Sequence, residues 1–435
     1  LRRPSYAAMR HYRLNDGQVI QIEVSHCKNI YSKLFNLREN YSGSECGMDR
    51  FHTPALHILG IALSGLAALA VAMGIGRFAF TPQLPLMQAD LGLSLSDGGW
   101  LAGANYLGYF AGAVLAGRKG MPAAMLMRCG LWAVVASTAA MAVSGPFAWW
   151  IAMRFVAGVA SAGVLVGTAT VILARLAMLG ARRLDGLVFA GVGTGIALAG
   201  LVCHAGVLLG MGARALWLAL AGLALVGTFI AHKVDVRSES FRSGISMPAA
   251  SAGQTSRGMH LLVLCYGLFG FGYILPATYL PSQARLLLDD PALFGWVWPL
   301  FGIAAALSTL SIAFLARWPR TYVWAGAQAV MAVGVSMPVI APGLCGLAVA
   351  ALCVGGTFML ITLLGLQEAR QQAGPSAQRL LAAMTAAFAA GQLAGPIAAN
   401  FLLEIGWPFS SALWLGSAAL LASSASLIHF TYQKS

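Results

Sequence analysis

Two arginines stand inside otherwise apolar segments, where a charged side chain needs a chemical reason. Arg77 belongs to the segment GIGRFAFTP, and Arg154 to FAWWIAMRFVAGV. A charge in hydrocarbon is unfavourable by a few kcal/mol or more, so both side chains should face protein or a water-filled cavity. Guanidinium groups bind anions through paired hydrogen bonds, and two at similar depth could bind one anion together. The alternative is that each arginine holds a backbone carbonyl or a helix end.

Polar and aromatic residues in other apolar segments could complete a binding site around such an arginine. Ligand pockets are mostly apolar and carry a few placed polar groups, which these side chains would supply. Their alternative role is hydrogen bonding between helices, which is common inside membranes. The candidates are Asn105, Tyr106, Tyr109, Tyr273 and Gln392.

Groups suited to proton relay or to catalysis are scarce in the apolar segments. No Asp or Glu falls near the middle of one, and the histidine that lies deep in one is His204. Proton relays in membranes use carboxylates or histidines, so His204 is a candidate proton site; the alternative is a packed histidine. No GxSxG, HExxH or Walker sequence is present, and the seven cysteines lack metal-ligand spacing. We therefore expect no enzyme, no cofactor and no metal site.

Twelve long apolar runs must position these residues. Each is close to the ~20 residues with which an α-helix crosses a bilayer. Of the 435 residues, 59% are hydrophobic and 9% are charged, against roughly 25% charged in a typical soluble domain. Both observations indicate an all-α integral membrane protein. The predicted spans are 56–80, 97–117, 124–145, 147–173, 186–209, 214–232, 259–282, 293–316, 321–341, 344–366, 380–403 and 409–430.

Basic residues gather in alternate connections between the spans, and this predicts the orientation of the chain. The even-numbered connections carry most of the Lys and Arg, whereas the odd-numbered ones carry only Arg214 and Arg285. Because cytoplasmic loops are enriched in Lys and Arg, both termini are expected in the cytoplasm. The same bias accounts for the net charge of +13 without any binding of nucleic acid.

Residues 1–47 form a polar, basic tail that lacks the apolar region of a signal peptide. Met48 directly precedes the first span, so we expect translation to begin there. The tail is then an extension of the gene model or a disordered segment. The alternative is a cytoplasmic regulatory tail.

The two halves of the span pattern resemble each other at an offset of 196 residues. Repeated halves are a known plan of transporters, with the substrate site near the midplane between them. We therefore expect two six-helix bundles, over 48–232 and 259–435, joined by a cytoplasmic linker at 233–258. The matching residues are Gly74, Gly76 and Arg77 with Gly270, Gly272 and Tyr273, and Gly99 and Trp100 with Gly295 and Trp296.

The segments at 74–94 (GIGRFAFTPQLPLMQADLGLS) and 99–117 (GWLAGANYLGYFAGAVLAG) resemble the YbfB/YjiJ-type branch of the major facilitator superfamily. The resemblance implies twelve transmembrane helices in two pseudo-symmetric bundles, with spans one, four, seven and ten lining a cavity. It implies transport but names no substrate. Arg154 and Gly158 match the superfamily's motif in the fourth span, which favours a functional role for Arg154.

The superfamily's loop motif between spans two and three is altered in this chain. The resemblance implies a gating role for Arg118, Lys119 and Gly120. Gly117 stands where the superfamily has an aspartate, so the gating salt bridge of that aspartate is in question.

Together these features predict a secondary active or facilitative transporter that works by alternating access in a bacterial inner membrane. We expect a monomer whose partners are the lipid bilayer and a small molecule, with possible proton coupling. The basic interior without carboxylates favours a small organic anion as substrate. One alternative is a proton-coupled efflux pump for drugs or metabolites. Another is a membrane receptor or sensor that transports nothing, although such a protein would need a sizeable cytoplasmic domain.

Overall fold

The computed structural model describes residues 10–13, 19–22, 53–118, 121–232, 256–287, 295–315, 317–373 and 377–432. The chain divides into two compact units, residues 1–58 and 59–435. In the first, strand β1 (Arg10–Arg13) pairs antiparallel with β2 (Val19–Ile22). The predicted linker at 233–258 lies almost wholly outside the described residues. The expectations for the tail and the linker therefore stay predictions.

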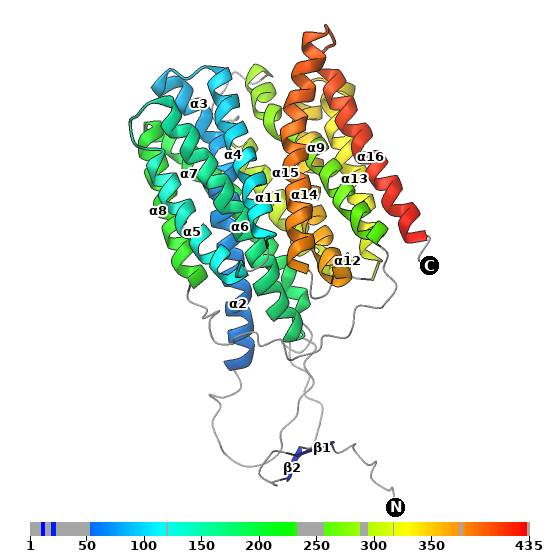
Figure 1. Cartoon of the computed structure of the whole chain (residues 1–435). Coiled ribbons are helices and arrows are strands. Elements are labelled where there is room, and N and C mark those ends of the chain that lie inside the picture. The colour runs from blue at the N-terminus through cyan, green and yellow to red at the C-terminus, as the bar shows by residue number, and fades with distance from the viewer. Residues whose placement is uncertain are drawn as a thin grey trace, which may run out of the picture. The chain divides into compact units, whose positions relative to one another are not determined.

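Helices make up the described part of the larger unit (Figure 1). The first predicted half contains α2 (Thr53–Leu69), the π-helix η2 (Ala70–Phe78), α3 (Phe80–Leu91), α4 (Leu95–Ala116), α5 (Ala123–Ala140), α6 (Phe147–Met178), the 3₁₀ turn η3 (Arg182–Leu184), α7 (Asp185–Leu208) and α8 (Ala213–His232). The second contains α9 (Ser256–Leu287), α11 (Val297–Leu310), α12 (Ile312–Leu315), α13 (Arg320–Ile340), α14 (Leu344–Ala373), α15 (Ala377–Glu404) and α16 (Ser410–Tyr432).

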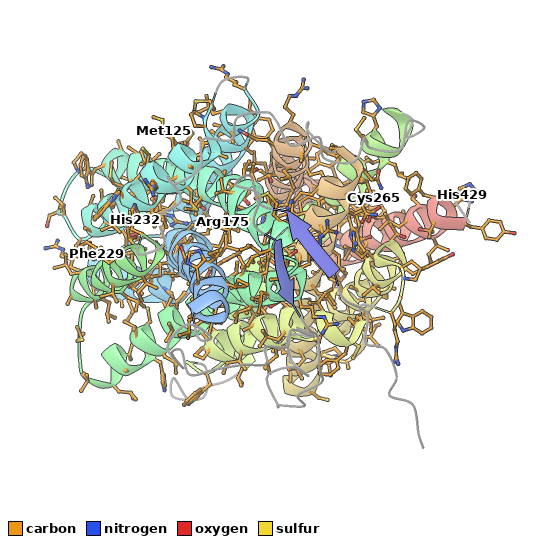
Figure 2. The ribbon with its side chains drawn as sticks, turned by 90° about the horizontal axis from the view of Figure 1, so that it is seen from below. Met125, Arg175, Phe229, His232, Cys265 and His429 are labelled. Atoms are coloured by element: carbon orange, nitrogen blue, oxygen red, sulfur yellow. The ribbon has the colours of Figure 1, made fainter. Side chains whose placement is uncertain are left out.

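The helices confirm an all-α membrane fold. Each predicted span coincides with a helix or a run of helices, and ten of the described ones are long and apolar enough to cross a membrane. The two others are α4, with its 22 residues, and the shorter α11, with 14. Large apolar side chains face outward, and Met125 and Phe229, at the periphery of the first bundle in Figure 2, are 56% and 55% exposed. An apolar outer surface of this kind suits a lipid bilayer.

One end of the larger unit collects arginines, and we call it the arginine-rich end. It includes the C-terminal ends of α4, α6 and α14 and the N-terminal ends of α7, α13 and α15, at the bottom of Figure 1. Its arginines include Arg118, Arg175, Arg182, Arg183, Arg317, Arg320, Arg370 and Arg379.

The first span is longer than predicted. The sequence suggested an end at residue 80, because the prolines and polar residues of TPQLP lower the hydropathy there. The helical run instead continues from Leu56 to Leu91. Proline is tolerated in the first turn of a helix, and membrane helices also accept it further inside. Arg77 therefore lies well within the helical run. The predicted span of 56–80 had placed it near the outer end.

Glycines let the helices of each bundle approach closely. A Cβ atom at Gly74 would overlap the backbone of Gly195 in α7, and one at Gly195 would overlap Ala70. The second bundle repeats this arrangement, because a Cβ at Gly270 in α9 would overlap the carbonyl of Phe388 in α15. Backbone contact of this kind is how membrane helices associate where no hydrophobic effect drives them together.

We predict that Gly74→Ala destabilises the protein and that Gly222→Ala does not. The new methyl group at 74 has to displace the backbone of α7, which lowers the free energy of unfolding by roughly 1–3 kcal/mol. At Gly222 in α8 a Cβ meets nothing within 4 Å, so the better helix propensity of alanine leaves stability unchanged or raised by up to about 1 kcal/mol. Thermal unfolding of both variants in detergent would measure this difference. Equal midpoints would contradict the proposed close packing.

Candidate functional site

Arg77 lies at the end of the π-helix η2, at the junction between the two bundles. Its side chain is 3% exposed, and its Nη2 donates a short hydrogen bond to Oε1 of Gln392 in α15. The guanidinium lies over the ring of Tyr109, with 3.9 Å from Cζ to the ring centroid. Its Nε and Nη1 have no hydrogen-bond partner. The Arg77 guanidinium is therefore a buried cation with two nitrogens that do not donate a hydrogen bond.

Arg154 in α6 is equally buried, but it binds the backbone. Its Nη1 donates to the carbonyl of Gly76 at 3.1 Å, and its Nη2 donates to the carbonyl of Arg77 at 3.3 Å. Asn105 in α4 adds hydrogen bonds to the Gly76 carbonyl at 3.4 Å and to the Arg154 carbonyl at 3.0 Å. Only Nε of the Arg154 guanidinium is left without a partner.

These contacts have a local cause in the geometry of the first span. A π-helix is rare and usually short, and it often marks a functional site. Where η2 ends and α3 begins, the backbone pattern changes, and carbonyls near the change need other donors. Arg154 and Asn105 supply them. The structure thus brings the two predicted arginines together, but Arg154 acts on the backbone that carries Arg77.

The predicted aromatic residues lie around Arg77 or beside its neighbours. Tyr106 is half-buried, with its ring centroid 5.6 Å from Cζ of Arg77. Tyr273 in α9 is fully buried and stacks on Phe358 of α14, with a centroid distance of 4.3 Å and an interplanar angle of 7°. The hydroxyl groups of Tyr109 and Tyr273 have no hydrogen-bond partner. These residues surround the cation with ring faces and unused polar groups.

Arg77 also lacks an acidic partner among the described residues. The buried charged side chains there are Arg77, Arg154 and Asp185. Asp185 lies at the arginine-rich end, where its Oδ2 accepts a hydrogen bond from Nε2 of Gln367 at 2.9 Å. The described interior around Arg77 is therefore basic, as the sequence predicted.

His204 lies at another contact between the bundles. It is half-buried in α7, with its ring centroid 5.4 Å from that of Trp296. Its Nδ1 faces Gly295, where an added Cβ would overlap it. No interaction links it to Arg77 in the described part of the chain, so a proton site at His204 stays a prediction.

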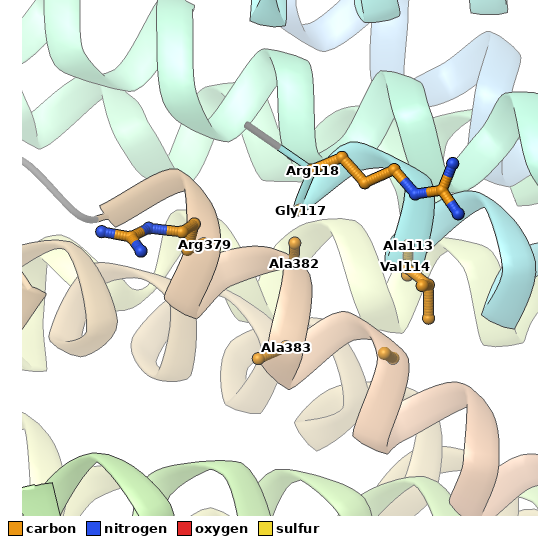
Figure 3. A pocket seen from close by; sticks show the side chains of 8 residues that line it. Ala113, Val114, Gly117, Arg118, Arg379, Ala382 and Ala383 are labelled. Carbon is orange, nitrogen blue, oxygen red and sulfur yellow. The ribbon is translucent and has the colours of Figure 1, made fainter. Parts of the chain in front are cut away.

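The altered loop motif lies at the arginine-rich end, and Lys119 and Gly120 fall outside the described residues. Arg118 is exposed and lines a pocket of about 240 Å³ between the end of α4 and the start of α15, together with Arg379 (Figure 3). The two helices are joined there by Gln378, whose Nε2 donates to the carbonyls of Ala116 at 3.0 Å and Met121 at 3.1 Å.

Sequence reasoning missed several residues that lie near Arg77, either along the chain or in space. Gln83 in α3 is fully buried, and neither of its side-chain polar atoms has a partner. Trp298 in α11 and Phe358 contact Phe78, next to Arg77, with centroid distances of 6.5 and 5.6 Å. Gln83 could have been found as a polar residue near Arg77. Trp298 and Phe358 could not have been found, because in a sequence an aromatic residue that lines a site cannot be distinguished from one that only packs in the core.

We predict that Arg154→Lys destabilises the protein even without substrate. An ammonium cannot reach both carbonyls in the fixed geometry of a guanidinium, so at least one charged hydrogen bond is lost. The expected decrease in the free energy of unfolding is about 2 kcal/mol, as measured by thermal unfolding in detergent. Arg214→Lys, at an exposed position in α8, is the control and should be neutral. Unchanged stability in Arg154→Lys would mean that the backbone contacts are not its main role.

Comparisons with known proteins agree with this architecture. The chain resembles the solved structure of the human organic anion transporter MFSD10 (TETRAN), with 17% identity, a TM-score of 0.62 and coverage of 86% of this chain and 100% of that one. It also resembles the solved structure of a mutant of the nucleoside transporter NupG, with 15% identity, a TM-score of 0.59 and coverage of 85% and 99%. A comparison with curated proteins finds no match.

The sequence itself assigns the family. A family model described as "Uncharacterised MFS-type transporter YbfB" matches residues 69–428. This range includes both arginines and nearly all of the described helices of the larger unit. It confirms a multi-pass membrane transporter that is not an enzyme and whose partners are the bilayer and a small-molecule substrate. The chain belongs to the YbfB-type family of the major facilitator superfamily.

Proposed function

We propose that this protein carries small organic anions and that Arg77 binds the anionic group. One observation carries the proposal: the Arg77 guanidinium is 3% exposed, has two nitrogens without partners and lacks a carboxylate partner among the described residues. A buried charge is usually paired or fully hydrogen-bonded, because its transfer from water is costly. A substrate anion would supply the missing pairing.

The position of Arg77 suits such a role. It belongs to the first bundle but bonds to Gln392 of the second, so it lies where the two halves of an alternating-access transporter meet. The Tyr109 ring partly compensates its charge through a cation–π contact. Arriving substrate could use Nε and Nη1 without first displacing Gln392. Arg154 and Asn105 are then positioning residues that hold the backbone of Arg77.

The similar solved structures include an organic anion transporter and a nucleoside transporter. At 17% and 15% identity these likenesses concern the fold, so the choice of an anion depends on the chemistry around Arg77. The lack of a buried acid near Arg77 among the described residues argues against a cation as substrate. Efflux of a drug or metabolite remains the competing function, and a receptor that binds without transport is the third.

We place the arginine-rich end in the cytoplasm of a bacterial cell, with both termini on that side and the protein in the inner membrane as a monomer. The support for this orientation is the positive-inside rule applied to the arginines that gather there. If transport is coupled to protons, His204 is our candidate site, since it touches Gly295 and Trp296 where α7 meets the second bundle.

The arginine-rich end would act as the cytoplasmic gate. Two side-chain amides join the bundles there: Gln378 binds the carbonyls of Ala116 and Met121, and Gln367 binds Asp185. Gly117, which replaces the superfamily's aspartate, lies against Ala382, where a Cβ would be only 3.1 Å away. An aspartate at 117 would therefore require Ala382 to shift by a few tenths of an ångström, and in this chain amide hydrogen bonds take the place of the salt bridge.

We predict that Arg77→Gln strongly lowers anion transport. Removal of one charged hydrogen-bond donor costs about 1.5–3 kcal/mol, which corresponds to a decrease of roughly 10-fold to 100-fold in anion binding. The measurement is uptake of labelled organic anions into proteoliposomes, with and without a proton gradient. Arg214→Gln removes an exposed arginine and should leave uptake unchanged.

The folding of Arg77→Gln is checked by size-exclusion chromatography and thermal unfolding, and Arg77→Lys provides a second variant that keeps the charge. Anion uptake that persists in both variants would overturn the role of Arg77. Cation or drug flux that survives Arg77→Gln would support the efflux alternative. Binding without flux in the unaltered protein would support a receptor.

We predict that Gln378→Leu opens the arginine-rich end, because leucine cannot donate to the two carbonyls. Spin labels at Met178→Cys and Trp318→Cys, both exposed and on different bundles, report the separation by pulsed electron paramagnetic resonance in a background without native cysteines. The distance distribution should shift to longer values. Gln371→Leu is the matched control, because Gln371 bonds to Arg320 within one bundle. A distribution unchanged by Gln378→Leu would contradict the gate.

A further inference from the structure

Aromatic rings dominate the surroundings of Arg77. Its guanidinium lies 3.9 Å from the ring centroid of Tyr109, 5.5 Å from that of Phe78 and 5.6 Å from that of Tyr106. A ring face carries partial negative charge and attracts a cation. In the structure, these ring faces partly balance the positive charge of Arg77, as a bound anion would.

The rings continue across the junction between the bundles. Phe78 contacts Trp298 and Phe358 of the second bundle, and Tyr109 contacts Phe388 with a centroid distance of 6.5 Å. When the two bundles rock against each other, such contacts have to separate on the side that opens. Separation exposes ring faces on both bundles beside the Arg77 cation.

Polar groups at the edges of this cluster are also unused. The hydroxyl groups of Tyr109 and Tyr273 and Nε1 of Trp298 are buried without partners. A buried donor that lacks a partner is unfavourable, and buried tyrosines and tryptophans usually find one. The cluster thus combines flat apolar faces with free polar groups around a cation, which is more than packing alone requires.

We infer that the transported anion is an aromatic carboxylate, bound with its carboxylate on Arg77 and its ring between the aromatic side chains of the two bundles. This inference rests on the proposed function and narrows its substrate class. A flat ring would replace the contacts that Phe78 loses to Phe358 and Trp298 when the bundles separate. A saturated acid of similar size fills the same space but has no ring face or edge for these partners.

The test compares benzoate with cyclohexanecarboxylate, which has the same charge and nearly the same size but no aromatic ring. Equilibrium binding of each labelled acid is measured to the full-length protein in lipid nanodiscs. Aromatic pairing beyond simple burial predicts that benzoate binds roughly 2- to 10-fold more tightly. Burial of apolar surface alone predicts no such preference, because the saturated acid is at least as large.

Phe358→Leu removes a ring face and should bring the two affinities to about the same value, while the binding of cyclohexanecarboxylate changes little. Phe401→Leu, at a position of α15 that is 59% exposed, is the matched control and should keep the preference for benzoate.

The outcomes separate this inference from the proposed function. Equal binding of both acids, or a preference that persists in Phe358→Leu, would overturn the aromatic substrate class and leave an anion carrier. Absence of binding by both acids, together with uptake of other anions that depends on Arg77, would also overturn it. Absence of any anion uptake would overturn the proposed function itself.

Discussion

The hydrogen bonds from Arg154 and Asn105 to the backbone carbonyls of Gly76 and Arg77 support the rest of the site. They lie where a π-helix gives way to an α-helix, and in a membrane no water is at hand to satisfy the backbone groups affected there. Helices α4 and α6 therefore have to lie close to the first span. Glycines provide this closeness: a Cβ at Gly76 would overlap Oγ of Ser161 in α6, and a Cβ at Gly158 in α6 would overlap the carbonyl of Asn105 in α4.

This support makes Arg77 different from Arg154. Both arginines are 3% exposed, yet Arg154 uses two nitrogens on the backbone, while Arg77 uses one on Gln392. A guanidinium whose two terminal nitrogens are both hydrogen-bonded to the backbone has little to offer a substrate. A cation with free donors, held by a hydrogen-bonded backbone at the junction between the two bundles, combines fixed geometry with unmet pairing. We attribute binding to Arg77 and positioning to Arg154 for this reason.

The contacts between the bundles are almost free of charge pairs in the described residues. Amides of Gln367, Gln378 and Gln392 make the polar contacts, and aromatic pairs and close glycine packing make the others. The ion pair between Arg320 and Glu368, at 3.6 Å, lies within the second bundle. The two bonds of Gln378 are neutral and contribute about 1 kcal/mol each, whereas the bonds of Gln392 to Arg77 and of Gln367 to Asp185 involve charged groups and contribute roughly 1.5–3 kcal/mol each. Each pairs an amide with one charged group at most, so the described contacts between the bundles are weaker than buried ion pairs would be.

The membrane fold, the succession of helices and the two buried arginines can be predicted from the sequence, because apolar runs of span length and charges inside them are local features. The sequence could not decide which arginine is free to bind, since that depends on carbonyls exposed at the end of a π-helix that hydropathy does not reveal. Nor could it assign Trp298 and Phe358 to the neighbourhood of Arg77. Residues more than 200 positions apart meet there through packing between the bundles, an arrangement that exists only in the folded protein.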